Sequence, residues 1–212
     1  MLHRARKAIS GILLLTLTAG LLPAVEHPAD LAALATAQAA HATLQGRFTW
    51  TVLRDGESQA REGSFAVARG EGDKPARYHV QMARADGSEL QRWCSDGERQ
   101  WKVERLVADD PTTQDVTEGD DPDLRRVVRC VLLDLTALGT EFTAAYEATA
   151  GRLVLTPRTP DLARSLAEIR VTLDGNQPRE VVLEDPQQGR ITVTLREVVT
   201  GQPVDERLFR VR

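Results

Sequence analysis

The chain has 212 residues, of which 42% are apolar and 27% charged, so it is long and apolar enough for one folded domain with a core. Aromatic residues make up only 4%, which disfavours a platform of stacked rings for sugars or bases. The formal net charge of −4 disfavours binding to phosphate backbones, so we expect no nucleic-acid partner.

Residues 1–24 have the pattern of a secretory signal peptide. Three cations within the first seven residues precede an apolar run from Ile9 to Leu22, and Ala24 offers a small residue for cleavage. The run is about 14 residues long, whereas a membrane span needs ~20, so a short membrane anchor is the less favoured alternative. No cysteine follows the run to accept a lipid. The sequence therefore predicts export to the periplasm, with residues 25–212 as one domain.

The segment from Asp30 to Leu44 is predicted to be a helix. Asp30 is a good N-cap, alanine is dense between Ala32 and Ala42, and Gly46 ends the pattern. The apolar stripe is mild, and its small side chains favour close packing on a sheet.

Alternating apolar and polar residues predict about five antiparallel strands between Phe48 and Val103. Glycine-containing turns are predicted at 54–57, 85–87 and 95–97. One face of this meander would be apolar and the other solvated.

Two segments of different character separate this meander from the C-terminal strands. Residues 109–123 are acidic and lack apolar periodicity, which favours a solvated loop over an ion-binding loop, since the spacing does not match a calcium loop. Residues 122–138 predict one helix, ended by Gly139, with a broad apolar face that needs a surface to cover. The apolar face of the sheet is the candidate surface. The lid positions on this helix are Leu124, Val127, Val128, Val131, Leu132 and Leu135.

Strands resume after Gly139, with a hairpin formed by residues 142–147 and 153–157. A short helical turn is expected near 161–166, hairpin turns near 174–176 and 186–189, and a final edge strand at Leu208, Phe209 and Val211. About ten antiparallel strands twist and curl toward a barrel. The predicted fold class is therefore mainly β, an incomplete antiparallel β-barrel or curved sheet covered by helices.

Motifs of catalytic and metal sites are absent from the sequence. His27, His41 and His79 are isolated, so we predict no metal site, no cofactor and no enzyme, although a chance carboxylate pair leaves a hydrolase as an alternative. Cys94 and Cys130 can form a disulfide in an oxidising compartment, worth ~2–4 kcal/mol, or stay as buried free thiols. The sequence leaves both alternatives open.

From Asp30 to Val211 the order of elements and several short motifs resemble the periplasmic outer-membrane lipoprotein carrier family, LolA. The resemblance implies an incomplete barrel whose mouth is covered by a helical lid. The motifs are Gly63-Ser64-Phe65-Ala66-Val67-Ala68-Arg69, Ser95-Asp96-Gly97 followed by Trp101, Leu153-Val154-Leu155-Thr156-Pro157, the Asp174-Gly175 turn, Ile191 to Leu195, and Leu208-Phe209.

The resemblance also implies roles for residues. In the family an arginine at the end of the second strand holds the lid helices closed, and Arg69 occupies that position. Gly70 follows it where the family usually has proline, and the chain ends at Arg212 where the family typically continues with a tail. The candidate residues of the lipid-binding cavity are Phe48, Trp50, Phe65, Val67, Tyr78, Val80, Trp93, Trp101, Leu153, Ile169, Val171, Ile191 and Val193.

The favoured hypothesis is a monomeric periplasmic carrier that binds the acyl chains of lipoproteins, or of another lipid, and shuttles them from the inner to the outer membrane. By resemblance its partners would be an inner-membrane transporter complex and an outer-membrane acceptor. The alternatives are an envelope-stress sensor or regulatory binding module of the same fold, and an accessory lipid carrier for an exporter.

Overall fold

The computed structural model describes residues 27–70, 74–84, 90–105, 114–119, 121–186 and 189–210. The predicted signal peptide of residues 1–24 and the predicted turn at 85–87 lie outside these ranges.

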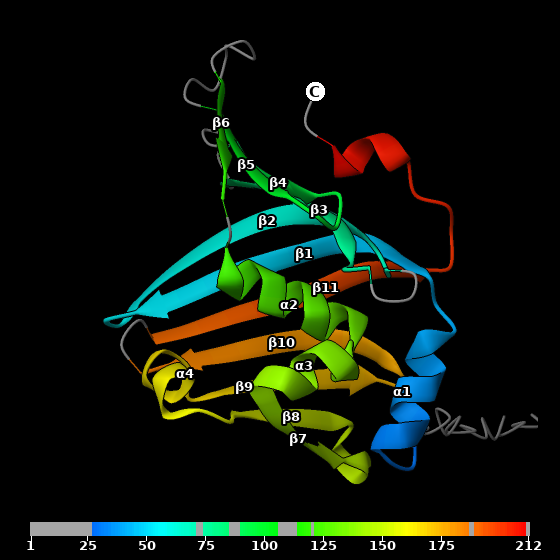
Figure 1. The fold of residues 1–212 in the computed structure, drawn as a ribbon. Helices are drawn as coiled ribbons and strands as arrows, with labels where there is room; N and C mark the ends of the chain where they lie inside the picture. Colours follow the sequence, from blue (N-terminus) through cyan, green and yellow to red (C-terminus); the bar gives the residue numbers. More distant parts are fainter. Residues whose placement is uncertain are drawn as a thin grey trace, which may run out of the picture.

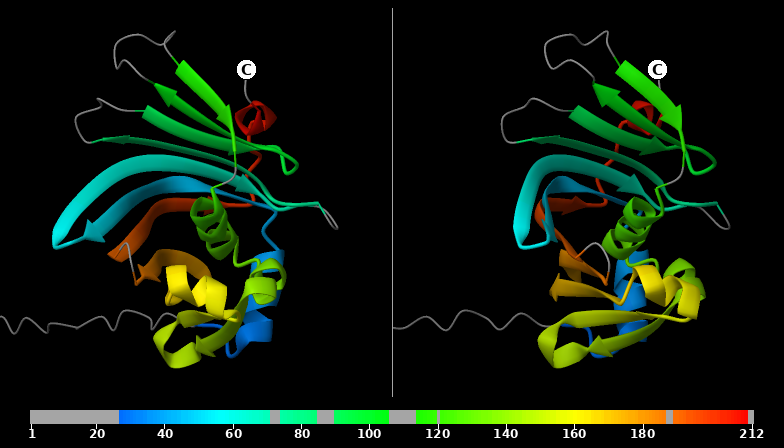
Figure 2. Two further views of the ribbon diagram at one scale, coloured as in Figure 1. Left: turned by 60° about the vertical axis from the view of Figure 1, so that its left-hand side comes forward. Right: turned by 90° about the vertical axis from the view of Figure 1, so that its left-hand side faces the viewer.

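A single antiparallel sheet of 11 strands dominates the structure (Figure 1). Its spatial order is β6-β5-β4-β3-β2-β1-β11-β10-β9-β8-β7. The first and last strands of the chain, β1 and β11, therefore pair in the middle of the sheet, and β6 and β7, which follow one another in the chain, lie at its opposite edges. The sheet curves around one face without closing, as the two side views make plain (Figure 2). This confirms the predicted fold class, a mainly β, open and curved sheet with helices. The strands are β1 Thr43–Arg54, β2 Glu57–Ala68, β3 Arg77–Arg84, β4 Leu90–Ser95, β5 Gln100–Arg105, β6 Gln114–Glu118, β7 Phe142–Glu147, β8 Arg152–Pro157, β9 Glu168–Asp174, β10 Gln177–Asp185 and β11 Gly189–Thr200.

Helix α1, Leu31–Ala39, begins as predicted, with the Asp30 side chain accepting a hydrogen bond from Ala33 N. It ends earlier than predicted. Thr43 already belongs to β1, where it pairs with Ala68 and its carbonyl accepts from Gly201 N at 2.9 Å. The alanine-rich pattern therefore extends beyond the helix because strand pairing overrides helix propensity.

The single helix predicted over 122–138 is two helices, α2 Pro122–Leu132 and α3 Leu135–Glu141. Leu133 adopts a left-handed conformation with φ 49°, and its N–H bonds to the carbonyls of Arg129 and Cys130. Asp134 then caps α3 by accepting from Ala137 N at 3.1 Å. Gly139 does not end the helix. Leu133, which is not a glycine, adopts the left-handed conformation that ends α2. Predicting the end of the helix from the position of Gly139 therefore gave the wrong boundary.

The acidic segment and the C-terminus also differ from expectation. Residues 114–118 form the edge strand β6 rather than loop, and residues 109–113 lie outside the described ranges. Glu206–Phe209 is the short 3₁₀ helix η2, so the predicted strand at Leu208 and Phe209 is wrong; Val211 lies outside the described ranges. The predicted turn near 161–166 is helix α4, Pro160–Ser165, and a second 3₁₀ turn, η1, covers Ala148–Ala150.

The main core lies between the concave face of the sheet and the helices in front of it (Figure 1). Buried side chains of both halves of the sheet contact those of α2 and α3 in one continuous cluster. Among the described residues, no helix is long and apolar enough to cross a bilayer.

Candidate functional site: a lidded apolar concavity

The strand register places most of the predicted cavity residues on the concave face. Residues directly opposite in an antiparallel pair share a face, and successive residues alternate. Phe65 lies opposite Val80, which lies opposite Trp93; in the other half, Trp50 lies opposite Val193. The residues that belong to, or pack against, the concave core cluster are Phe48, Trp50, Phe65, Val67, Tyr78, Val80, Trp93, Leu153, Ile169, Val171, Ile191 and Val193.

Trp101 does not belong to this cavity. It lies opposite Cys94, which lies opposite His79, so it shares the convex face with them. Lys102 faces the concavity instead, with its ammonium 5.9 Å from the Trp93 ring centre. Alternation alone suggested that the apolar residues of β5 point inward. They point outward because the register of β5 places Trp101 opposite Cys94 and Val103 opposite Arg92. A second apolar surface lies on this side of the neighbouring strands.

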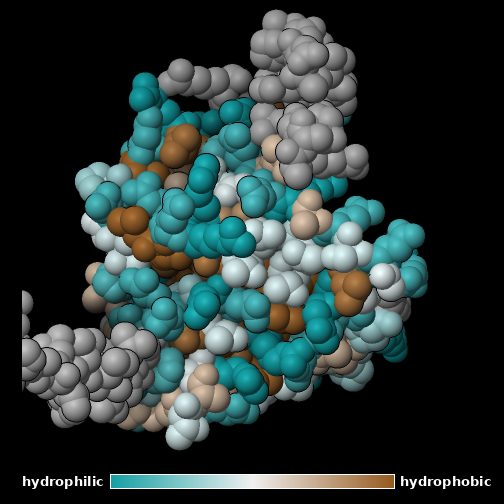
Figure 3. Space-filling view, turned by 180° about the vertical axis from the view of Figure 1, so that it is seen from behind, coloured by the Kyte–Doolittle hydropathy of each residue, from teal (hydrophilic) through white to brown (hydrophobic). Residues whose placement is uncertain are grey.

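That second surface is the packing of η2 on β3 and β4, on the convex side. Phe209 is fully buried beneath the guanidinium of Arg77, 5.0 Å from the ring centre, and Arg77 also pairs with Glu206. The face seen from behind is otherwise largely hydrophilic with small hydrophobic patches (Figure 3).

His79 makes this convex cluster sensitive to acid. Burial, with Arg92 nearby, lowers the pKa of His79 below its usual value. The unfolded chain therefore binds the proton more readily, and stability falls as pH drops below about 6.5 toward the folded-state pKa. We expect urea unfolding to show a smaller loss of stability between pH 7.5 and 5.5 in His79→Gln than in the wild type. Equal losses in the two proteins would contradict this assignment.

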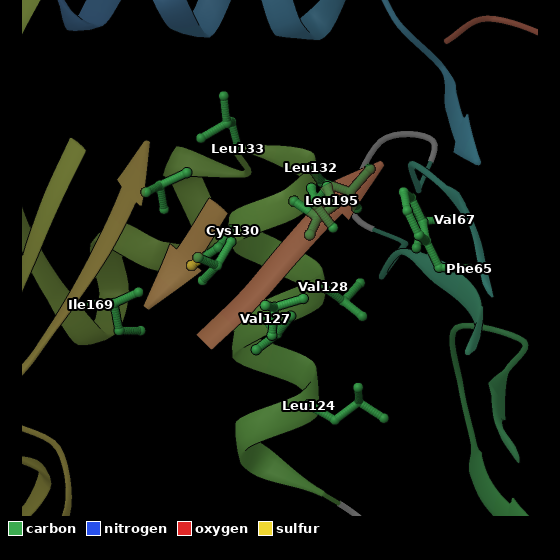
Figure 4. Packing of buried hydrophobic residues seen from close by; sticks show 14 of the residues in the cluster. Phe65, Val67, Leu124, Val127, Val128, Cys130, Leu132, Leu133, Ile169 and Leu195 are labelled. Atoms are coloured by element: carbon green, nitrogen blue, oxygen red, sulfur yellow. The ribbon is translucent and has the colours of Figure 1, made fainter. Parts of the chain in front are cut away.

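The lid is the apolar face of α2, which lies across the concavity. Leu124 and Val128 point toward the strand carrying Phe65 and Val67, whereas Cys130 points toward Ile169 (Figure 4). The space between helix and sheet is only about 20 Å³. Side chains of the helix therefore fill the hollow in this closed state. The predicted lid residues Leu124, Val127, Val128, Val131 and Leu132 are buried here, and Leu135 on α3 packs against the same cluster.

Arg69 joins the end of β2 to the ends of two helices. Its Nε donates to the carbonyl of His41, just after α1, at 2.9 Å, and its guanidinium donates to the carbonyl of Leu132, the last residue of α2. Its backbone N–H donates to Ala42 O at 2.8 Å. Burial lowers the pKa of Arg69, while the charge of Asp134 acts in the opposite direction. The guanidinium thus satisfies a carbonyl that the helix end leaves without a partner.

Ion pairs unite the two lid helices. Glu141 of α3 accepts from Arg126 at 3.0 Å and from Arg129 at 2.7 Å, and Arg126 also pairs with Asp123 at 2.9 Å. These partly buried contacts hold α2 and α3 together, so a movement of α2 away from the sheet would carry α3 with it.

A larger pocket of about 680 Å³, here named the open-end pocket, lies beside the N-terminus of α2. Trp50 and Leu124 line both this pocket and the small space under the lid, so the two are contiguous. Its lining is part apolar and part polar. The residues are Trp50, Val52, Arg54, Asp55, Glu57, Gln59, Arg61, Met82, Gln91, Trp93, Asp121, Asp123, Leu124 and Ile191.

Sequence reasoning missed the polar residues of this pocket. Arg61 donates to Gln91 Oε1 at 2.5 Å, Gln91 donates to Glu104 at 2.7 Å, and Lys102 pairs with Glu104 at 2.7 Å. These four form a polar ladder across β2, β4 and β5 on the concave face, and Arg61 and Gln91 are the members that line the pocket. Arg61, Gly63 and Phe65 occupy alternate positions of β2 and therefore share one face. This spacing is the sequence feature from which the position of Arg61 in the concavity could have been predicted.

Both cysteines are buried free thiols in this structure. Burial raises the pKa of Cys94 and raises that of Cys130 to about 12, so neither thiol ionises readily. We expect unfolded, unreduced protein to give two reactive thiols per chain, and native protein at pH 8 to resist iodoacetamide. Protein that yields no thiols when unfolded without reductant would instead contain the disulfide.

Within the described ranges, no group of three or more His, Cys, Asp or Glu side chains is arranged to hold a metal ion.

No protein-family model matches the sequence, and no curated protein matches it. Among solved structures, the chain is similar to a DUF1329 family protein from Desulfovibrio piger, at 12% identity and a TM-score of 0.45, over 84% of this chain and 94% of that one. It is also similar to a LolA superfamily protein from Nitrosomonas europaea, at 11% identity and a TM-score of 0.44, over 81% of this chain and 91% of that one.

A chain of the Pseudomonas aeruginosa MucA/MucB complex is similar at 17% identity and a TM-score of 0.40, over 82% of this chain and 57% of that one. The solved structures thus include a member of the LolA superfamily, which the sequence motifs resemble.

Proposed function

We propose that this protein is a non-enzymatic periplasmic carrier that binds the acyl chains of lipoproteins, or of another lipid, between its concave sheet and the α2–α3 lid. The observation that supports this most is the latch. A continuous apolar face is covered by a helix pair whose end is held by one guanidinium on a main-chain carbonyl.

The energetics favour reversible binding. Each buried CH₂ contributes about 0.8 kcal/mol, so one acyl chain supplies several times the energy of the latch. The lid's apolar side chains occupy the site in the closed state, so a ligand must replace them. This replacement subtracts from the net affinity and keeps handover to an acceptor feasible.

The open-end pocket is the proposed entry. Its apolar floor of Trp50, Trp93 and Ile191 continues beneath α2, and its polar ladder faces the same space. An amphiphile could place its tail on the floor and its head against the polar wall, then advance as the lid lifts. By the sequence resemblance, the donor and the acceptor would be membrane-bound partners.

The test is binding of a tripalmitoylated cysteinyl lipopeptide, and of a fluorescent fatty acid, to delipidated protein. We expect stoichiometric binding to the wild type, reduced at least about tenfold in Trp50→Glu, where a charge replaces an apolar wall. Val199→Glu is the matched control, because Val199 is exposed on the same sheet and its replacement should leave affinity unchanged. Absence of binding by the folded wild type would refute the carrier function.

A further inference from the structure

A second depression, here named the latch groove, lies at the other end of α2 from the open-end pocket. It has a volume of about 930 Å³ and is walled by the end of α2, the start of α3, the segment after β2 and the turn between β4 and β5. Arg69 and Leu132, the two partners of the latch, both line it. An occupant of this groove would therefore touch the lid's fastening directly.

The latch groove is rich in cations although the whole chain has a formal net charge of −4. Its lining contains five cations, of which Arg129 pairs with Glu141 of α3, and three carboxylates. The open-end pocket is lined by two cations and four carboxylates. Charge thus differs in sign between the two ends of the lid. The charged residues of the groove are Arg69, Lys74, Arg99, Arg125, Arg129, Glu98, Glu118 and Asp134.

Arg69 is a cation held by neutral acceptors. Within the described part of the chain it donates to two main-chain carbonyls and forms no ion pair, and Asp134 acts on it only through space because that carboxylate caps α3. A carboxylate brings a full negative charge and can accept two parallel N–H groups of a guanidinium, neither of which a main-chain carbonyl offers. A carboxylate that entered the groove would compete with the Leu132 carbonyl for the guanidinium and weaken the closed state.

We propose that the latch groove binds an acidic peptide segment of a partner protein and that this binding releases Arg69 from the lid. The groove's positive lining supplies the charge complementarity, and its concave shape suits a chain segment. An anionic bilayer is the less suitable occupant, because the net charge of the chain as a whole opposes approach to it. The link to acyl binding rests on the carrier function proposed above.

Linkage fixes the sign of the effect. If both the acidic segment and the acyl ligand favour the open lid, each raises the affinity for the other. The partner that fits the groove is therefore one that assists loading.

The docking test uses labelled hexaglutamate and hexaglutamine with the lipid-free full chain, followed by fluorescence anisotropy. We expect hexaglutamate alone to bind, and the double variant Lys74→Glu with Arg99→Glu to weaken binding at least about fivefold. Arg179→Glu with Arg164→Glu has the same net charge but alters residues outside both the groove and the open-end pocket, so its affinity should stay within about twofold of the wild type. Equal weakening in both double variants, or equal binding of the two peptides, would overturn the docking site. So would hexaglutamate failing to bind while phosphatidylglycerol vesicles retain the protein.

The coupling test measures fatty-acid affinity with and without saturating hexaglutamate. We expect hexaglutamate to tighten fatty-acid binding in the wild type and to have no such effect in Arg69→Leu. Unchanged affinity in the wild type would overturn the release of the latch. Failure of any fatty acid to bind would instead overturn the carrier function and leave the peptide result to decide the groove.

Discussion

Replacing Arg69 with leucine should raise the affinity for an acyl ligand by about 10- to 100-fold and slow its release. Hydrogen bonds to charged groups contribute about 1.5–3 kcal/mol, and Arg69→Leu removes those that hold the closed lid on the carbonyls of Leu132 and His41. A ligand that requires the open lid no longer has to break them. The same change should lower the free energy of unfolding by about 1–3 kcal/mol, since a helix end loses its partner. Fatty-acid titration and urea unfolding measure the two effects.

A residue that holds the lid closed should, when replaced, raise the affinity for the acyl ligand while lowering the free energy of unfolding. Replacing a residue with only a structural role should lower the free energy of unfolding without raising the affinity. Arg158→Leu is the matched control, because Arg158 donates to the carbonyl of Phe142 at 2.8 Å, where α3 passes into the edge strand β7, rather than to the end of α2. It should lower stability without raising affinity. If Arg69→Leu loses stability while its affinity falls or stays constant, Arg69 is not a latch.

The period of two along strands was enough to identify most of the concave face from the sequence. A residue such as Val193 is flanked by polar neighbours, and its burial follows once one face of the sheet is covered. Trp101 was placed on the wrong face, because alternation separates the two faces of a strand without indicating which of them lines the cavity. The 3₁₀ helix η2, which covers the convex side, has no periodic signal of its own.

Sequence patterns predicted the wrong helix boundary where a residue other than glycine adopts the conformation that glycine usually adopts. Leu133 ends α2 in the left-handed region that glycine favours, while Gly139 lies inside α3. The polar strand β6 was predicted as loop because an edge strand with solvated faces needs no apolar alternation. The polar ladder of the open-end pocket was missed for a similar reason. Its polar residues lie on the concave face, which is identified in the sequence by apolar residues at every second position, and they interrupt that alternation.

Gly63→Ala should destabilise the protein by about 2–3 kcal/mol and disturb the floor of the cavity. Gly63 begins the motif that ends at Arg69, and it lies opposite Phe48 on β1. A Cβ atom built there would be 2.2 Å from the carbonyl oxygen of Gln81 and 2.5 Å from Cζ of Phe48. The main-chain oxygen belongs to the neighbouring strand and cannot turn aside, so strand and ring must both shift, as in other overpacked cores. Urea unfolding would measure the cost.

Gly139→Ala provides the contrasting case at a second glycine. A Cβ atom at Gly139 meets no heavy atom within 4 Å, and the residue lies inside α3, where alanine is favoured over glycine by roughly 0.5–1 kcal/mol. This variant should therefore be slightly more stable than the wild type and should bind acyl ligand normally.

The two glycine variants should also differ in their effect on the lid. The shift forced by Gly63→Ala should move the Phe48 ring toward Val128 and Val131 of α2, which line the same small space, and so weaken the packing of α2 on the sheet. Equal stability of the two variants would mean that the close packing of Phe48 over Gly63 does not exist in solution.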